Sequence, residues 1–308
     1  MDTNITRPFL KWVGGKTQII GEVLAGFPAD INSYHEPFLG GGSVLLGMLS
    51  LVRAGKIHVA GDIRASDLNP NLIALYTNIQ QNPAELIRET NRLVEAFGAI
   101  AGTAVNRKAS TEDEASTSQE SYYFWIRARF NALYGAERSA PLASAMMLFL
   151  NKTCFRGVYR EGPRGFNVPF GNYKNPAVIE EAHIWAVSDL VKDVKFAVAP
   201  YSEALARAAP GDFVYLDPPY APESDKSFVG YTSDGFGAES HADLFGKCRD
   251  LEAAGVRILM SNADVRLVRD AFPAERFAVK TISCRRSINS KRPGSKANEV
   301  LIASHTGQ

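Results

Sequence analysis

The chain has 308 residues, of which 45% are hydrophobic and 22% charged, and both proportions lie in the range of folded soluble proteins. They exclude an intrinsically disordered chain and a collagen-like repeat. Lysine and arginine number 34 against 33 aspartate and glutamate residues, so the formal net charge of +1 identifies no class of partner.

Positive charge is nevertheless concentrated in two segments. Residues 152–174 hold five basic side chains and one glutamate, a local charge of +4, and residues 280–298 hold six basic side chains and no acid. Two such segments in a neutral chain favour a surface that faces a polyanion, and basic loops that are merely solvated are the alternative.

Cysteine usage and the polar N-terminus bear on the cellular compartment. Cys154, Cys248 and Cys284 are too far apart for a zinc cluster and odd in number, so we predict neither a metal site nor a disulfide framework. No run approaches the ~20 apolar residues that span a bilayer, and no secretory signal is recognisable. We therefore expect a cytoplasmic protein without membrane attachment.

Two units of strand, turn and helix are expected in the first part of the chain. Residues 34–38 form a strand that runs into the glycine-rich turn 39–43 and an apolar helix at 44–51. Residues 56–66 form a second β-rich stretch, which ends at Asp67 and precedes another helix.

Two further strands are expected in the last third of the chain. Residues 213–216 form a buried strand that ends at Asp217, and residues 256–260 form another. Strands that alternate with helices predict an α/β fold with a parallel sheet covered by helices on both faces.

A mostly helical stretch, roughly residues 83–181, interrupts this alternation. Its clearest helices are expected at residues 84–97 and 121–134, with a polar interruption at 102–120. Residues 151–173 are rich in glycine, arginine and aromatic side chains and predict turns or a hairpin. A helical module inserted into an α/β domain is the economical interpretation.

The segment Asp217-Pro218-Pro219-Tyr220 answers the requirements for methylating a conjugated amino group. The amine of adenine or glutamine is a poor nucleophile because its lone pair is delocalised. A site must therefore accept hydrogen bonds from both of its N–H groups. The Asp217 carboxylate and the Pro218 carbonyl can supply these two acceptors, and the prolines stiffen the turn.

In this interpretation Tyr220 stacks on the flat substrate, and Asp217 is an orienting acceptor rather than a full base. The proton need leave only after the methyl group arrives. The alternative is an ordinary turn at a strand end with a helix cap. A position at the carboxyl end of a buried strand favours a ligand site, because open α/β sheets bind ligands there.

Two other segments are candidates for binding a ligand. The turn at residues 36–43 lets the backbone approach a ligand closely, but it lacks the G-x-G-x-x-G pattern of dinucleotide sites. Asp67 is placed to bind a ribose diol, with a helix N-cap as the alternative. Residues 9–16 offer Trp12 and two lysines, although a core tryptophan with surface lysines would have the same pattern.

Together these motifs closely resemble those of the Dam-type family of DNA adenine-N6 methyltransferases, over nearly the whole chain. The segments that carry the resemblance are residues 9–16, 36–43, 67–69, 151–160, 166–171, 217–220 and 286–288. The glycine motif precedes the catalytic motif, with the recognition insert between them. This order is that of the family's α group, the D12 class.

The resemblance implies a Rossmann-like, S-adenosylmethionine-dependent methyltransferase sheet with an inserted, mostly helical target-recognition domain. The catalytic domain would comprise residues 1–80 and 186–308, and the recognition domain would comprise residues 81–185 with its hairpin at 151–173. Residues 222–237, just beyond the catalytic motif, would form a mobile loop.

The resemblance also implies the cofactor and its site. The residues implied around S-adenosyl-L-methionine are Trp12, Gly14, Lys16, Glu36, Phe38, Gly40, Asp67, Tyr201, Ser202 and Asp217. Among them Asp67 would bind the ribose, and Tyr201 and Ser202 would flank the adenine. The catalytic residues implied are Asp217, Pro218, Pro219 and Tyr220. No metal is implied.

Double-stranded DNA is the partner that the resemblance implies, with the target adenine flipped out of the duplex. The residues implied at the DNA are Lys11, Arg129, Lys152, Phe155, Arg156, Val158, Arg160, Pro169, Arg285 and Arg286. Phe155 would be an aromatic wedge, or else a hydrophobic anchor within the hairpin. Arg160 would read a guanine edge, and Arg129 and Arg285 would contact phosphate.

The recognition hairpin departs from the family pattern at two places. Arg156 stands where members often have asparagine, and residues 162–165 are shorter and less acidic than usual. Both departures concern the target sequence rather than the chemistry. We expect GATC, because Arg160 and residues 166–171 match its readers.

Three hypotheses about function follow. The first is a site-specific DNA adenine-N6 methyltransferase, with no obligate protein partner and expected to be a monomer, a dimer being the alternative. The second keeps the chemistry but acts on RNA or a protein glutamine. The third is a DNA-binding regulator without turnover, against which the intact segment 217–220 argues.

Overall fold

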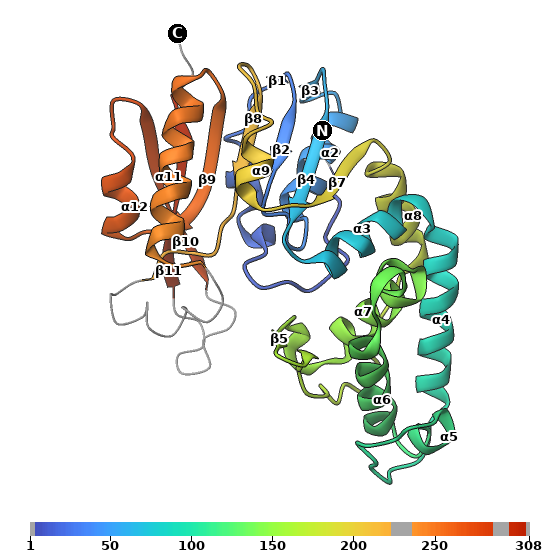
Figure 1. Cartoon of the computed structure of the whole chain (residues 1–308). Coiled ribbons are helices and arrows are strands. Elements are labelled where there is room, and N and C mark those ends of the chain that lie inside the picture. Colours follow the sequence, from blue (N-terminus) through green and yellow to red (C-terminus); the bar gives the residue numbers. More distant parts are fainter. Residues whose placement is uncertain (1–3, 223–235, 286–295, 306–308) are drawn as a thin grey trace.

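A seven-stranded sheet in the order β10-β11-β9-β8-β2-β4-β7 forms the centre of the molecule (Figure 1). The computed structural model describes residues 4–222, 236–285 and 296–305. In sheet order the strands span Phe277–Arg285, Lys296–Ser304, Arg257–Ala263, Phe213–Leu216, Tyr34–Glu36, Ile63–Asp67 and Val194–Val198. A separate parallel pair is formed by Asp30–Ile31 (β1) and His58–Val59 (β3).

The five strands from β9 to β7 run parallel, as the alternation of strands and helices predicts. Strand β11 is antiparallel to both of its neighbours, so the sheet is mixed. The sequence analysis does not predict β10 and β11. It also ends β9 too early, because Ser261 and Asn262 continue to pair with Leu301 and Val300 of β11.

The strand order reverses between β2 and β8. From β2 the chain proceeds outward through β4 to β7, and then returns to β8 on the other side of β2 and continues to β9. Ligands of open α/β sheets bind at such a switch point, beyond the carboxyl ends of the strands. Glu36 at the end of β2 and Asp217 just after β8 lie at this point.

Helices pack on both faces of the sheet (Figure 1). They span Ile20–Leu24 (α1), Ser43–Arg53 (α2), Pro70–Gln81 (α3), Glu181–Leu190 (α8), Tyr201–Leu205 (α9), Ala238–Ala253 (α11) and Arg266–Ala271 (α12). Phe213 and Tyr215 of β8 belong to the hydrophobic cluster of α1, α2, α3 and α8. Val214 and Leu216 belong to the cluster of α9, α11 and α12. Strand β8 is therefore buried on both faces, as a central parallel strand should be.

Four helices between β4 and β7 lie beside the sheet rather than on it (Figure 1). They span Pro83–Ala99 (α4), Glu112–Ala115 (α5), Gln119–Ala132 (α6) and Pro141–Thr153 (α7). The two helices expected here, at residues 84–97 and 121–134, both form with ends shifted by one or two residues. Ser118 fixes the start of α6, because its side chain accepts a hydrogen bond from the Ser121 N–H at 3.1 Å.

The stretch at 151–173 begins as the end of α7 and continues as turns and a small hairpin. Its strands, Glu161–Gly162 (β5) and Gly165–Phe166 (β6), are antiparallel. Short 3-10 helices occur at Lys16–Gln18, Gly135–Ser139 and Phe155–Gly157. Of the other expectations, Arg286 and residues 223–235 of the predicted mobile loop lie outside the described residues.

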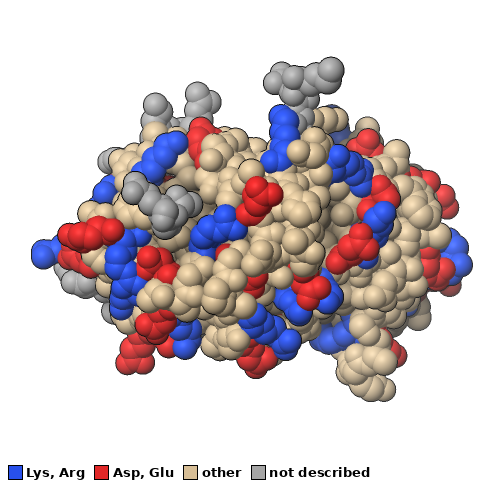
Figure 2. Space-filling model, turned by 90° about the horizontal axis from the view of Figure 1, so that it is seen from above, with Lys and Arg blue, Asp and Glu red and all other residues tan. Residues whose placement is uncertain are grey.

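The charged side chains are interspersed on the face that carries the amino ends of the parallel strands. Figure 2 shows this face, where lysine and arginine alternate with aspartate and glutamate. Asp62, for example, lies within ion-pair distance of both Arg64 and Lys195. A polyanion would find little net attraction here, in contrast to the basic hairpin.

Candidate active site

Asp217 directly follows β8 and forms an ion pair with Lys16. The distance between Asp217 Oδ2 and Lys16 Nζ is 2.7 Å, and Lys16 is only 4% exposed. The same Nζ donates to the carbonyl oxygen of Gly14 at 2.6 Å and lies 4.9 Å from the centroid of the Tyr220 ring. Burial raises the pKa of Asp217 above its usual range, and the Lys16 ammonium opposes this shift. The ion pair therefore offsets part of the cost of charging a partly buried carboxylate.

Side chains from three other elements hold the remainder of the catalytic corner, residues 217–221. The Tyr220 hydroxyl donates to Glu299 Oε2 of β11 at 2.7 Å, and the Ala221 N–H donates to Asn262 Oδ1 of β9 at 3.0 Å. His241 of α11 lies against the backbone of the corner. The sequence analysis missed Glu299, Asn262 and His241, because no local pattern marks them and only the sheet brings them here.

Glu36 is a buried carboxyl group at the end of β2. It is 2% exposed, and its Oε2 accepts a hydrogen bond from the Tyr34 hydroxyl at 2.6 Å. Burial raises the pKa of Glu36 to about 8, the Tyr34 hydrogen bond lowers it, and the neighbouring Asp217 raises it further. Burial therefore favours the uncharged form of Glu36 at neutral pH, beside the ion pair of Asp217 with Lys16.

Asp67 braces the glycine-rich turn from the end of β4. Its Oδ2 accepts a hydrogen bond from the Gly40 N–H at 3.0 Å, and its Oδ1 accepts one from the Asn69 N–H at 2.9 Å. Asn69, not Asp67, caps α3, because its side chain accepts from the Leu72 N–H at 3.1 Å. The N-cap alternative for Asp67 is therefore wrong, and its carboxylate stays at the sheet edge beside the turn.

Gly42 shows why the turn needs glycine. Its φ is +67°, and a Cβ built on it would lie 2.0 Å from the Tyr76 hydroxyl oxygen, which itself donates to the Gly41 carbonyl at 2.9 Å. Neither the backbone conformation nor the space admits a side chain. The turn consequently packs tightly at the start of α2.

Trp12 connects this turn with the recognition hairpin. Its ring stacks on Tyr159 with a centroid distance of 5.0 Å and an interplanar angle of 22°. Gly40 lies against the same ring, since a Cβ on it would be 3.2 Å from Trp12 Cδ1, and a Cβ on Gly41 would be 2.8 Å from the tryptophan Cβ. Trp12 is partly buried, and the implied contact with a cofactor stays a prediction.

An aromatic cluster lies beyond the ends of β2 and β7. Phe38 stacks on Tyr201 with a centroid distance of 5.5 Å, and Phe236 packs against both rings. The Tyr201 hydroxyl donates to Asp243 Oδ2 at 2.8 Å, while Ser202 is exposed. The structure thus brings Phe38 and Tyr201 into contact, and their implied contacts with a cofactor stay predictions. It adds Phe236, which no motif indicated.

The recognition hairpin presents several of its implied DNA-binding residues to solvent. Phe155 is 49% exposed, and Arg160 and Pro169 are exposed, while Val158 is half-buried. Arg160 Nε donates to Asn167 Oδ1 at 2.7 Å, which orients its guanidinium. An exposed aromatic ring and an oriented arginine on one hairpin are suited to contact a flat, polar ligand.

The other implied basic residues have different surroundings. Lys11 is exposed, with Nζ 5.3 Å from the Tyr173 ring, and Arg129 stacks on Trp125. Arg285 ends β10, and nothing is described of its side chain.

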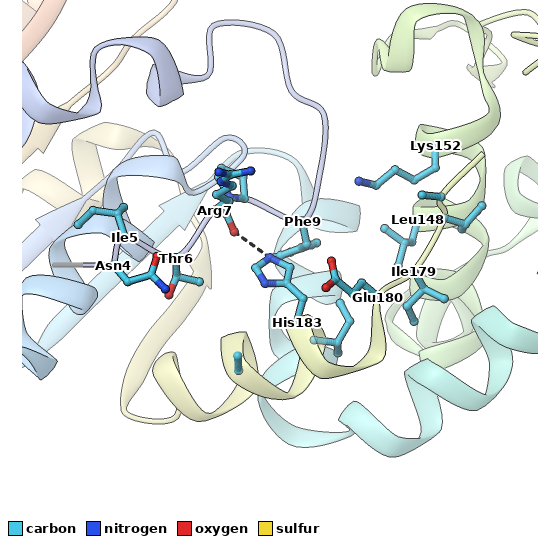
Figure 3. A pocket seen from close by; sticks show the side chains of 15 residues that line it. Asn4, Ile5, Thr6, Arg7, Phe9, Leu148, Lys152, Ile179, Glu180 and His183 are labelled. Carbon is cyan, nitrogen blue, oxygen red and sulfur yellow. Dashed lines mark hydrogen bonds between the residues drawn. The ribbon is translucent and has the colours of Figure 1, made fainter. Parts of the chain in front are cut away.

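Lys152 extends into a cavity of about 510 Å³ between the N-terminal segment and helices α7 and α8 (Figure 3). Glu180 and His183 line the same cavity, and His183 Nε2 lies 2.9 Å from the carbonyl oxygen of Arg7. Burial lowers the pKa of Lys152, and Lys11 lowers it further. Lys152 therefore lies in this cavity rather than among the exposed side chains of the hairpin.

Arg156 has a left-handed backbone conformation, with φ 59° and ψ 7°. Asparagine tolerates this region better than arginine, so Arg156→Asn is expected to increase the free energy of unfolding by up to about 1 kcal/mol. Urea denaturation at equilibrium measures the change. Arg164→Asn, an exposed arginine of the same hairpin without a positive φ, is the matched control and should leave stability unchanged. A loss of stability in Arg156→Asn would contradict the argument.

The part of the chain that the structure describes contains neither a cluster of metal-ligating side chains nor a membrane-spanning helix. No group of three or more histidine, cysteine, aspartate or glutamate side chains there is placed to hold a metal ion. No helix in residues 4–222, 236–285 and 296–305 has both the length and the apolar character needed to cross a membrane.

The amino-acid sequence is similar to those of known proteins over nearly its whole length. The family model described as D12 class N6 adenine-specific DNA methyltransferase matches residues 12–288. The Type II methyltransferase M.MjaIII of Methanocaldococcus jannaschii is 32% identical over 309 residues, covering 97% of this chain and 99% of that protein. The DNA adenine methylase of Serratia marcescens is 32% identical over 302 residues, covering 96% and 97%.

The DNA adenine methylase of Escherichia coli K12 is 30% identical over 299 residues, covering 96% of this chain and 94% of that protein. Among solved structures, TrmN from Thermus thermophilus gives a TM-score of 0.38 at 10% identity, covering 93% of this chain and 48% of that one. The family model and the relatives span nearly the whole chain, and the family model reaches from Trp12 past the catalytic corner. The chain belongs to the D12 class of N6 adenine-specific DNA methyltransferases.

Proposed function

We propose that this protein transfers the methyl group of S-adenosyl-L-methionine to N6 of an adenine in double-stranded DNA, within the sequence GATC. The observation that carries the proposal is the catalytic corner, in which a partly buried carboxylate, Asp217, follows β8 at the switch point of the sheet and pairs with Lys16 at 2.7 Å. A charged acceptor at this position suits an amine that must be oriented rather than fully deprotonated.

The residues at the sheet edge fit S-adenosyl-L-methionine by their chemistry. Asp67 lies at the end of β4, where its carboxylate has lone pairs left for ribose hydroxyls after accepting two backbone N–H groups. Phe38 and Tyr201 offer aromatic surface to an adenine, and the glycine-rich turn allows a close approach of the backbone. The cofactor, when bound, supplies an electrophilic methyl group on a sulfonium.

The chemical step assigns one task to each group of the corner. Asp217 and the Pro218 carbonyl accept hydrogen bonds from the two N6 hydrogens and so orient the amine. The bound cofactor would supply the methyl group to this nitrogen. The methylated nitrogen would then lose one proton, which Asp217 would receive or pass to water. Tyr220, with its hydroxyl held by Glu299, stacks on the base.

DNA recognition is proposed for the helical insertion, residues 81–185. A stacked adenine cannot reach the corner, so the base must leave the duplex at a cost of a few kcal/mol. Phe155, about half exposed on the hairpin, is suited to fill the gap, and Arg160 is suited to a guanine edge. We propose that the enzyme acts as a monomer in the cytoplasm.

Mapping of modified bases tests the proposal directly. Unmethylated plasmid is incubated with the protein and labelled S-adenosyl-L-methionine, and every modified base is then identified. We expect N6-methyladenine at GATC and at no other tetranucleotide. Label in RNA or in protein glutamine but not in DNA would overturn the assigned substrate. DNA binding without any methyl transfer would support the alternative of a DNA-binding regulator.

Arg160→Ala should change the sequence preference of the same reaction. Loss of a bidentate contact to guanine costs about 1–3 kcal/mol of discrimination at one base pair, so sites that differ from GATC at that pair should become methylated. Arg164→Ala, an exposed arginine of the same hairpin, is the control and should keep the preference. Equal weakening on all sequences would instead assign Arg160 to phosphate.

A further inference from the structure

The backbone of the catalytic corner has few degrees of freedom. Pro218 and Pro219 each fix their own φ through the pyrrolidine ring, so the direction of each carbonyl depends on the ψ angle of its residue. The ψ of Pro219 decides where its carbonyl oxygen points and how the chain enters Tyr220. A group that binds the Pro219 carbonyl oxygen therefore fixes the peptide between Pro219 and Tyr220. This peptide connects Pro218, the proposed acceptor of the amine, with the ring of Tyr220.

His241 is the side chain that binds the Pro219 carbonyl oxygen. Its Nε2 lies 3.0 Å from the Pro219 carbonyl oxygen, and its ring is fully buried at 0% exposure. Its Nδ1 lies 2.9 Å from the Gly237 carbonyl oxygen, which already accepts a hydrogen bond from the His241 backbone N–H at 3.0 Å. A carbonyl can only accept, so Nε2 donates to the Pro219 carbonyl in the tautomer that carries its hydrogen on Nε2. A ring with hydrogen on both nitrogens would make the same bond.

The imidazole also touches the aromatic cluster. The Phe236 ring meets it edge to face at a centroid distance of 4.8 Å, and Phe236 in turn packs on Phe38 and Tyr201. His241 thus lies between the catalytic corner and the rings beyond β2 and β7. Its side chain binds backbone carbonyls and packs against the rings of Phe236 and Phe245.

We propose that His241 is a positioning residue for methyl transfer, which acts by donating a hydrogen bond from Nε2 to the Pro219 carbonyl and so fixes the catalytic corner. The proposal rests on the function proposed above. Misplacement of a reacting group by about 1 Å can cost on the order of 100-fold in rate. The effect should therefore fall on the chemical step and not on the binding of either substrate.

Two substitutions of His241 distinguish the effect of its hydrogen bond from the effect of its aromatic ring. His241→Phe keeps an aromatic ring against Phe236 but has no donor, whereas His241→Gln loses the ring and can place an amide N–H near the position of Nε2. Single-turnover rates on a GATC duplex, KM for each substrate and the fraction of active sites are measured for both. We expect the phenylalanine variant to be about 10- to 100-fold slower with both KM values unchanged, and the glutamine variant to recover most of the rate.

Phe245→Leu is the matched control. Phe245 is a buried residue of the same helix whose ring lies 5.7 Å from His241 and makes no hydrogen bond to the corner. It should lower thermal stability without slowing the single-turnover rate of the folded enzyme. An unchanged rate in His241→Phe, or a glutamine variant that is folded and as slow as it, would overturn the proposal. Absence of adenine methylation by the unsubstituted enzyme would instead refute the proposed function.

Discussion

Replacement of Asp217 by asparagine is expected to reduce methyl transfer by about 1,000-fold, the size of effect seen when one preorganised polar group at a reacting centre is removed. The amide still offers one oxygen to Lys16, so the fold should persist. It lacks the negative charge that stabilises the developing positive charge on N6. Single-turnover transfer to a GATC duplex measures the loss, and affinity for DNA and cofactor should stay within a few-fold of the parent.

Asp217→Ala is a less suitable variant, because it leaves the buried Lys16 ammonium without its partner. Removal of one member of a buried ion pair costs roughly 3–5 kcal/mol. The double variant Lys16→Met with Asp217→Ala removes both charges and should recover stability but not activity. This comparison separates catalytic loss from unfolding. Normal turnover in Asp217→Asn would refute the role assigned to the carboxylate.

Glu36→Gln is expected to flatten the pH dependence of stability. The pKa of Glu36 is about 8 in the folded protein against an ordinary value of 4.5, because burial disfavours its charge. The folded state therefore keeps a proton that the unfolded chain releases, and the free energy of unfolding falls as pH rises from about 4.5 to about 8. The penalty is absent below this window and complete above it, where it amounts to at most about 5 kcal/mol.

Denaturant unfolding at pH 5, 6.5 and 8 measures this difference. Glutamine still accepts the hydrogen bond of the Tyr34 hydroxyl but cannot ionise, so the variant should match the parent near pH 5 and be more stable at pH 8. Glu203→Gln, on the exposed surface of α9, should follow the parent at all three values. Equal pH dependence of Glu36→Gln and the parent would show that Glu36 is charged in the folded protein.

Local sequence is informative where a motif and its function lie in one segment. The buried run 213–216, the Asp-Pro-Pro-Tyr turn after it and the glycine-rich turn before α2 are visible in the chain, because strand ends, prolines and glycines impose their geometry within a few residues. The helices near 84–97 and 121–134 follow in the same way from their helical pattern.

The C-terminal strands β10 and β11 became recognisable only in the tertiary structure. The apolar run at residues 300–303 of β11 is visible in the sequence, but the pairing of β11 with β9 joins residues 36 to 44 positions apart, and no local pattern indicates that partner. The same pairing prolongs β9 through Ser261 and Asn262, where sequence reasoning ends it. Hydrogen bonds between strands are decided by which edge is free, and that is a property of the assembled sheet.

The sequence by itself determined the family, the order of the motifs and the residues of the catalytic corner, because each of these is a short run whose chemistry is local. The tertiary structure alone decided which side chains control that corner. Lys16 and Asp217 form an ion pair although 200 residues separate them in the sequence. Glu299 and His241, which contact the corner, belong to β11 and α11. Such contacts depend on burial and on the meeting of distant elements at one edge of the sheet, for which no local pattern exists.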